Sequence, residues 1–229
     1  MRDTLTQICN ELMSNALPLL RPTANNTNGI EPETDSYQLN EESNDPVNLI
    51  KLSFFGYMLG WSLAKFGSLN LELPQAFWSR LCGGIEYVYT LKDLRSQDAI
   101  MANHLERILS TSNQSTDEEF SAVYGDYVFN LELASCSLPI ELCQDGNTKH
   151  LTKANAAEYV DLYLEAFTKV DALQFKIVYH AIEDVATHKI MSMLTPENAK
   201  RRMCAVSIIN VEAFKAQTTI YFQGRKFNA

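Results

Sequence analysis

The sequence has 229 residues, of which 46% are apolar, and its formal net charge is −9. This length and apolar content suit one large domain or two small ones with a sizeable core, and the negative charge argues against nucleic acid as a partner. The five cysteines form no CxxC pair and no metal-ligand spacing with the four histidines, which predicts no disulfide framework, no zinc and no cofactor.

The first predicted element is a helix in residues 4–20, ended by Pro18. Its apolar face comprises Leu5, Ile8, Leu12, Met13 and Ala16. Residues 21–46 are rich in Asn, Thr, Glu, Ser and Pro, and this composition predicts a long surface loop tethered by Tyr37 and Leu39. Nothing at the start resembles a signal peptide, and we expect a reducing location, cytoplasmic or nuclear.

An apolar run follows at residues 52–63, with Gly56 and Gly60 at the spacing that packs transmembrane helices together. The run is only about a dozen residues long, whereas a membrane span needs about 20. Lys65 and Pro74 interrupt it. The pattern therefore predicts a buried helix, with glycines that let another element approach closely, and no membrane segment.

The next segment begins with a predicted capping box at Thr90-Leu91-Lys92-Asp93, and Ser96 is predicted to start a second helix. One wide face of that helix carries Ile100, Met101, His104, Leu105, Ile108 and Leu109. Residues 111–119 are polar and predict an acidic loop.

The periodicity then changes from 3.6 to 2, because Tyr127, Phe129, Leu131 and Leu133 alternate with other residues. Residues 138–142 predict a second short strand, and Asp145-Gly146 is a turn signal. No other stretch predicts β structure convincingly.

Helices dominate the remainder of the chain. Thr152 is predicted to cap a helix that ends at Phe167, and a second helix is predicted from Asp171 to His188. Three further signals are the Thr195-Pro196-Glu197 start, the basic Lys200-Arg201-Arg202 at a helix end, and an Asn210 cap before a helix at 211–216. The predicted fold class is α+β, mostly helical, with one small sheet inserted in the middle.

Catalytic chemistry is not indicated by residue spacing. Each cysteine lies in an apolar or strand context without a flanking motif, and His104 lies on the apolar edge of its helix, as a core or interface histidine would. The acidic pairs Glu118-Glu119 and Glu183-Asp184 are typical of solvated surfaces. From these residues alone the function stays open.

Six segments, in order, resemble the amino-terminal lobe of HECT-type ubiquitin ligases, with a flavour of the large HERC-type members. They are Phe54–Ser62 for a Phe-x-Gly-x-x-x-Gly-x-Ala pattern, Leu69–Leu81, Thr90–Leu94, Leu151–Asn155 with Glu158–Val160, Leu194–Glu197 with Cys204, and Asn210–Lys215 with Thr218. Ser62 replaces the usual alanine, and Ala205, Asn198, Ala199 and Ile220 also depart from the pattern.

The resemblance implies a HECT amino-terminal lobe with a small inserted subdomain of helices and a β-hairpin. It assigns residues 1–95 and 164–229 to the large helical subdomain and 96–163 to the small one. The family transfers ubiquitin through a cysteine in a carboxy-terminal lobe, which we do not expect before Ala229, and none of the five cysteines matches that position. The expected fragment has no catalytic residue and is inactive alone.

The small subdomain of the family docks the ubiquitin-conjugating enzyme, so the implied partners are that enzyme and the ubiquitin it carries as a thioester. Protein substrates are expected to bind through other regions of the ligase. The resemblance carries the docking groove onto Met101, His104, Leu105, Thr111, Asp117, Glu118, Phe120 and Tyr159. A methionine suits an adaptable binding surface, and acids at the rim suit a partner bearing lysines.

Three alternatives remain open from the sequence. Leu105 and Phe120 are also typical of plain core residues, and Thr111 stands where the family often has an aromatic anchor, which predicts weaker docking. The whole lobe would also suit a non-catalytic scaffold, or a helical protein-interaction domain unrelated to the family.

Overall fold

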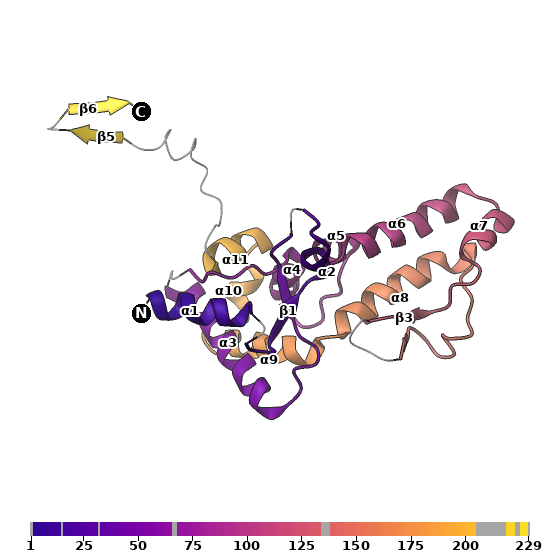
Figure 1. Ribbon diagram of the computed structural model, residues 1–229, viewed down its shortest axis with the longest axis horizontal. Coiled ribbons are helices and arrows are strands. Elements are labelled where there is room, and N and C mark those ends of the chain that lie inside the picture. Colours follow the sequence, from indigo (N-terminus) through magenta and orange to yellow (C-terminus); the bar gives the residue numbers. More distant parts are fainter. Residues whose placement is uncertain are drawn as a thin grey trace.

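The computed structural model describes residues 2–14, 16–31, 33–65, 68–133, 138–204, 219–222 and 225–228, most of them helical (Figure 1). The helices are α1 (Arg2–Leu12), α2 (Ala24–Asn28), α3 (Pro46–Lys65), α4 (Gln75–Gly83), α5 (Leu91–Gln97), α6 (Ala99–Gln114), α7 (Asp117–Tyr124), the 3-10 turn η1 (Lys153–Asn155), α8 (Ala156–Lys169), α9 (Ala172–Glu183), α10 (His188–Ser192) and α11 (Pro196–Met203). Three antiparallel strand pairs join β1 (Leu20–Pro22) to β2 (Tyr37–Leu39), β3 (Asn130–Leu131) to β4 (Ile140–Glu141), and β5 (Thr219–Phe222) to β6 (Arg225–Asn228). The mostly helical α+β class is confirmed.

Buried apolar side chains form two clusters. The first core is built mainly from α1, α3, α4, α9 and α11, around Trp78, Phe55 and Phe175. The second core is built mainly from α6, α7, β3 and α8, around Phe120 and Phe129. The helices of the second core form one end of an elongated molecule (Figure 1). The subdomain boundaries at 1–95, 96–163 and 164–229 stay a prediction.

Helix α3 packs against α9 through its two glycines, as predicted. A Cβ atom at Gly56 would lie 2.5 Å from the Val178 carbonyl oxygen, and one at Gly60 would lie 2.9 Å from Val185 Cβ. The helix is only half buried, because Val47, Ile50, Phe54 and Trp61 on its outer face are exposed. Among the described helices, none is long and apolar enough to cross a membrane.

The predicted surface loop at 21–46 is wrong over much of its length. Strands β1 and β2 pair through it, and α2 lies between them with Thr23 as its N-cap. Polar side chains are buried in this segment, and hydrogen bonds satisfy them. Asn25, for example, donates to the Arg95 carbonyl and accepts from the Ala99 N–H, each at 2.8 Å. The predicted tether Leu39 is buried in the first core, and Tyr37 packs against that core.

Two helices are shorter than predicted. Helix α1 ends at Leu12 rather than near Pro18. Just after this end, the Ser14 hydroxyl donates to the Glu11 carbonyl and accepts from the Ala16 N–H. These local bonds compete with a continuing helix. Helix α9 ends at Glu183, and the Val185 N–H bonds Ile182 three residues back before α10 begins.

Cap signals in the sequence are mostly confirmed. The Thr90–Asp93 capping box is present, and Thr195 caps α11 with proline at its first position. The predicted start at Ser96 is wrong, because Asp98 caps α6 by accepting from the Met101 N–H at 2.9 Å. The Ser96 hydroxyl instead accepts from the Ala76 N–H, which ties α5 to α4.

The middle segment is less regular than its alternation predicts. The predicted strand at 127–133 is reduced to β3, with Phe129 and Leu131 buried, and Asp145 adopts a positive φ of 58° in the predicted turn. The hairpin is not the only β structure, since two other strand pairs exist. The predicted Asn210 cap and the helix at 211–216 lie outside the described residues.

Candidate functional site: an aromatic and acidic surface on the second core

Helix α6 supplies the base of the candidate site. Ala102, Leu105 and Ile108 are fully buried in the second core, while Met101 and His104 are half-buried at the edge of the same face. Thr111 is also half-buried, three turns further along. At 1.5 Å per residue, Met101 and Thr111 are about 15 Å apart, so one small groove cannot include both.

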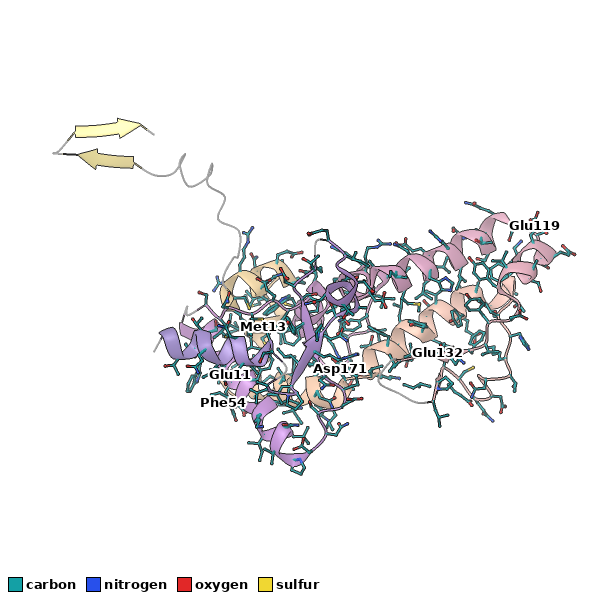
Figure 2. All side chains as sticks on the ribbon, in the orientation of Figure 1. Glu11, Met13, Phe54, Glu119, Glu132 and Asp171 are labelled. Carbon is teal, nitrogen blue, oxygen red and sulfur yellow. The ribbon has the colours of Figure 1, made fainter. Side chains whose placement is uncertain are left out.

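The predicted acidic loop at 111–119 is wrong over most of its length, because α6 continues to Gln114 and α7 begins at Asp117. Thr116 accepts from the Glu119 N–H, and the Glu119 carboxylate accepts from the Thr116 N–H at 2.9 Å, which forms a capping box. Asp117 and Glu118 are exposed in the first turn, where carboxylates favour the helix dipole. Figure 2 shows Glu119 at the far tip of the molecule.

Rings connect α7 to α6. Phe120 lies 5.0 Å from Tyr124, Tyr124 lies 6.1 Å from His104, and His104 lies 5.4 Å from Tyr127, measured between ring centroids. Phe120 is fully buried and Tyr124 is 7% exposed, whereas Tyr127 is 41% exposed and Val123 of α7 is 62% exposed. We call His104, Val123, Tyr124 and Tyr127 the aromatic patch.

The aromatic patch changes which predicted residues a partner can reach. Leu105 and Phe120 are fully buried and Tyr159 is 5% exposed, so these three support the patch from the core. Burial raises the pKa of Tyr159 to about 12. Burial, with Arg107 second, lowers the pKa of His104, which favours a neutral imidazole beside the tyrosines.

Val123, Tyr124 and Tyr127 belong to the candidate patch but not to the groove expected from the sequence. When residues 111–119 are predicted to be a loop, no helical periodicity is applied to the residues that follow. The grouping of residues 120, 123 and 124 on one side of a helix is then missed. The available signal was the Thr116-x-x-Glu119 capping box immediately before an apolar residue.

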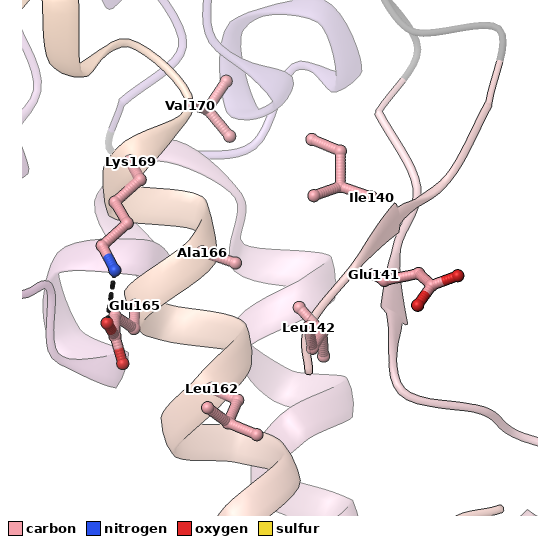
Figure 3. A pocket seen from close by; sticks show the side chains of 8 residues that line it. All are labelled: Ile140, Glu141, Leu142, Leu162, Glu165, Ala166, Lys169 and Val170. Atoms are coloured by element: carbon pink, nitrogen blue, oxygen red, sulfur yellow. Dashed lines mark hydrogen bonds and ion pairs between the residues drawn. The ribbon is translucent and has the colours of Figure 1, made fainter. Parts of the chain in front are cut away.

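Two cavities flank α8. Met101 lines a cavity of about 270 Å³ together with Arg21, Gln97 and Tyr163. A groove of about 380 Å³ runs between β4 and α8, and Lys169 pairs with Glu165 along its side (Figure 3). None of the eight side chains that line the groove carries a thiol, hydroxyl or imidazole.

Three of the described cysteines, Cys9, Cys82 and Cys204, are poor nucleophiles. Cys9 and Cys204 are buried, and burial raises the pKa of Cys204 to about 12 and that of Cys82 to about 11. A thiol that accepts an acyl group needs the opposite shift. Among the described residues, no group of three His, Cys, Asp or Glu side chains is arranged to hold a metal ion.

A family model described as HECT-domain (ubiquitin-transferase) matches residues 6–227. The chain belongs to this HECT family. It is 27% identical over 217 residues to the E3 ubiquitin-protein ligase HERC2 of Mus musculus and of Homo sapiens, and 25% identical over 237 residues to the probable E3 ubiquitin-protein ligase HECTD4 of Homo sapiens. Each match covers 95% of this chain.

The resemblance to HECT ligases, and to the large HERC-type members among them, is thus confirmed. The HECT chain spans only 4% of the length of the HERC2 relatives and 6% of the HECTD4 relative.

Proposed function

We propose that this HECT chain docks a ubiquitin-charged conjugating enzyme through the aromatic patch and the acidic first turn of α7. Ubiquitin then passes to a catalytic cysteine outside the described residues and on to a substrate lysine. The observation that carries the proposal is that the second core exposes Val123 and Tyr127 and that the first turn of α7, on the same core, exposes Asp117 and Glu118. Exposed aromatics serve as anchors at interfaces, and a rim of acids favours a partner with lysines.

The proposal differs from the sequence-based groove in its contact residues. Val123, Tyr127 and half-buried His104 would meet the partner, while Leu105, Phe120 and Tyr159 would hold them in place from below. Asp117, Glu118 and Thr111 would form the rim, and Met101 would lie at the margin. Docking must be transient, because the conjugating enzyme leaves to be recharged, so a dissociation constant of about 1 μM suits it.

Binding is tested by titrating the chain with a panel of conjugating enzymes that carry ubiquitin in a stable linkage, using calorimetry. Val123→Asp should weaken binding by at least tenfold. Val47→Asp is a matched control, because Val47 is 58% exposed but lies on α3 of the first core. Equal binding by both variants would refute the docking surface. Leu105→Ala is unsuitable, since truncating a fully buried leucine destabilises the fold by about 2–5 kcal/mol.

Transfer is tested separately. We propose that the chain alone forms no thioester with ubiquitin, and the raised pKa values of Cys9, Cys82 and Cys204 support this for those three thiols. Incubation with a charged conjugating enzyme, followed by a non-reducing gel, should show no reducible adduct on the chain. An adduct mapped to any of its cysteines would contradict this. A non-catalytic scaffold is the second candidate, and a parent protein that never discharges any member of the panel would favour it.

A further inference from the structure

The chain crosses between the two cores at two places that lie against each other. One crossing leads from α4 to α5 through Tyr89, and the other leads from α8 to α9 through Val170 and Asp171. The Tyr89 N–H donates to the Thr168 hydroxyl oxygen at 2.9 Å, and both residues are buried. Figure 2 shows Asp171 at the junction of the two ends of the molecule.

A buried ion pair lies at this junction. Arg80 of α4 donates to the Asp171 carboxylate at 2.6 Å, and the two side chains are 3% and 18% exposed. The guanidinium also lies 4.0 Å from the ring centroid of Phe175 in α9 and 5.7 Å from that of Tyr89. Arg80 therefore contacts both crossings and the first turns of α9 at once.

Stability alone does not explain this pair. The free-energy cost of removing two charges from water offsets the favourable energy of their attraction. Replacing a buried pair by apolar side chains of similar size is therefore often neutral or stabilising for the fold. One donor of Arg80, the Nε–H, has no partner among the described residues, which adds to the unfavourable side. The pair instead restricts the relative orientation of the groups it joins, because a planar guanidinium bonds a carboxylate and stacks on a ring in only a narrow range of orientations.

We infer that the Arg80–Asp171 pair is a positioning element that fixes the orientation of the second core relative to the first. Its consequence rests on the proposed function: a docked conjugating enzyme is held on the second core, so this angle sets where its ubiquitin is presented. The pair does not touch the aromatic patch, so it should act on orientation and leave docking affinity unchanged.

The test measures orientation, stability and docking in parallel. Spin-labelled amino acids are incorporated during translation at Ile50 of α3 and Asp161 of α8, which are both exposed and lie outside the proposed docking surface. The distribution of distances between the two labels is measured by double electron–electron resonance. In the Arg80→Met/Asp171→Leu variant we expect a distribution at least twice as wide, a melting temperature no lower than that of the wild type, and an affinity for the conjugating enzyme within twofold. A wild-type width would overturn the inference.

Two further variants keep the test decisive. Arg95→Met/Glu106→Leu removes an exposed pair with the same 2.6 Å separation, and it should leave the distribution unchanged. Should the buried double variant fail to fold, Arg80→Lys retains the charge but loses the planar fork, and it should still broaden the distribution. A wild-type width in Arg80→Lys would overturn the directional role. If the distance distribution widens in the double variant but neither the wild type nor any variant binds a conjugating enzyme, only the proposed function is refuted.

Discussion

The close approach of α3 and α9 predicts that Gly56→Ala destabilises the protein, although alanine favours a helix. The added Cβ would lie 2.5 Å from the Val178 carbonyl oxygen and 2.7 Å from Ala181 Cβ. Ordinary contacts between such atoms are about 3.5 Å, so the helices must separate by up to about 1 Å. The obstructing atom belongs to the backbone of α9 and cannot rotate away.

Two opposing effects set the magnitude. Alanine gains about 1 kcal/mol over glycine inside a helix, whereas overpacking a core costs about 1–3 kcal/mol. The upper end applies here, because separating the helices also loosens the first core, to which α3 contributes buried Phe55 and α9 contributes buried Ile182. We expect a net loss of about 2 kcal/mol, which lowers the melting temperature of a chain this size by about 4–8 °C.

Urea denaturation followed by circular dichroism measures this difference, and Gly60→Ala is the matched comparison. Its Cβ would meet Val185 Cβ at 2.9 Å and the Ile182 carbonyl oxygen at 3.3 Å, so the required displacement is smaller than at Gly56. Gly60→Ala should therefore destabilise the protein less than Gly56→Ala does. If Gly56→Ala were as stable as the wild type, or Gly60→Ala the more damaging change, the close-contact reasoning would fail.

Three other predictions address the site and its support. Thr111→Tyr should tighten docking by about 1–3 kcal/mol in calorimetry by adding an aromatic anchor, and no gain would place residue 111 outside the interface. The lowered pKa of His104 means that its contribution to stability is present above about pH 6.5 and is lost as the pH falls towards the folded-state pKa; His104→Gln should flatten this part of a melting-temperature profile, and an unchanged slope would contradict it. Asn25→Ala leaves two part-buried backbone groups without their side-chain partner and should destabilise the protein by about 1–3 kcal/mol in total. The exposed Asn28→Ala should stay within about 0.5 kcal/mol of the wild type in urea titrations.

Signals that act within one turn of chain were readable from the sequence. The Thr90–Asp93 box, the Thr195 cap and the glycine pair are confirmed, because each depends on residues three or four positions apart. The segment 21–46 was not readable, because its polar residues are satisfied far along the chain. Asn25 bonds residues at positions 95 and 99, and no local pattern shows such bonds.

The candidate site was predicted in part for a similar reason. Periodicity correctly grouped Met101, His104 and Leu105 on one side of α6, but it cannot say which of them a neighbouring helix covers. That depends on α7 and α8, which bury Leu105 completely and leave His104 at the edge beside Tyr127. The accessible aromatic patch is thus a tertiary property.

Helix α9 links the glycine contact to the ionic junction. Gly56 of α3 packs on Val178, while Arg80 stacks on Phe175 less than one turn earlier on the same helix. A displacement of α9 by a methyl group at position 56 would therefore also move one wall of the Arg80 site. Since residues that share a packed element do not contribute independently, the presentation of the docking surface depends on how tightly α3 holds α9. The transmembrane-like glycine spacing in this chain thus serves an internal contact, which supports the orientation of the second core.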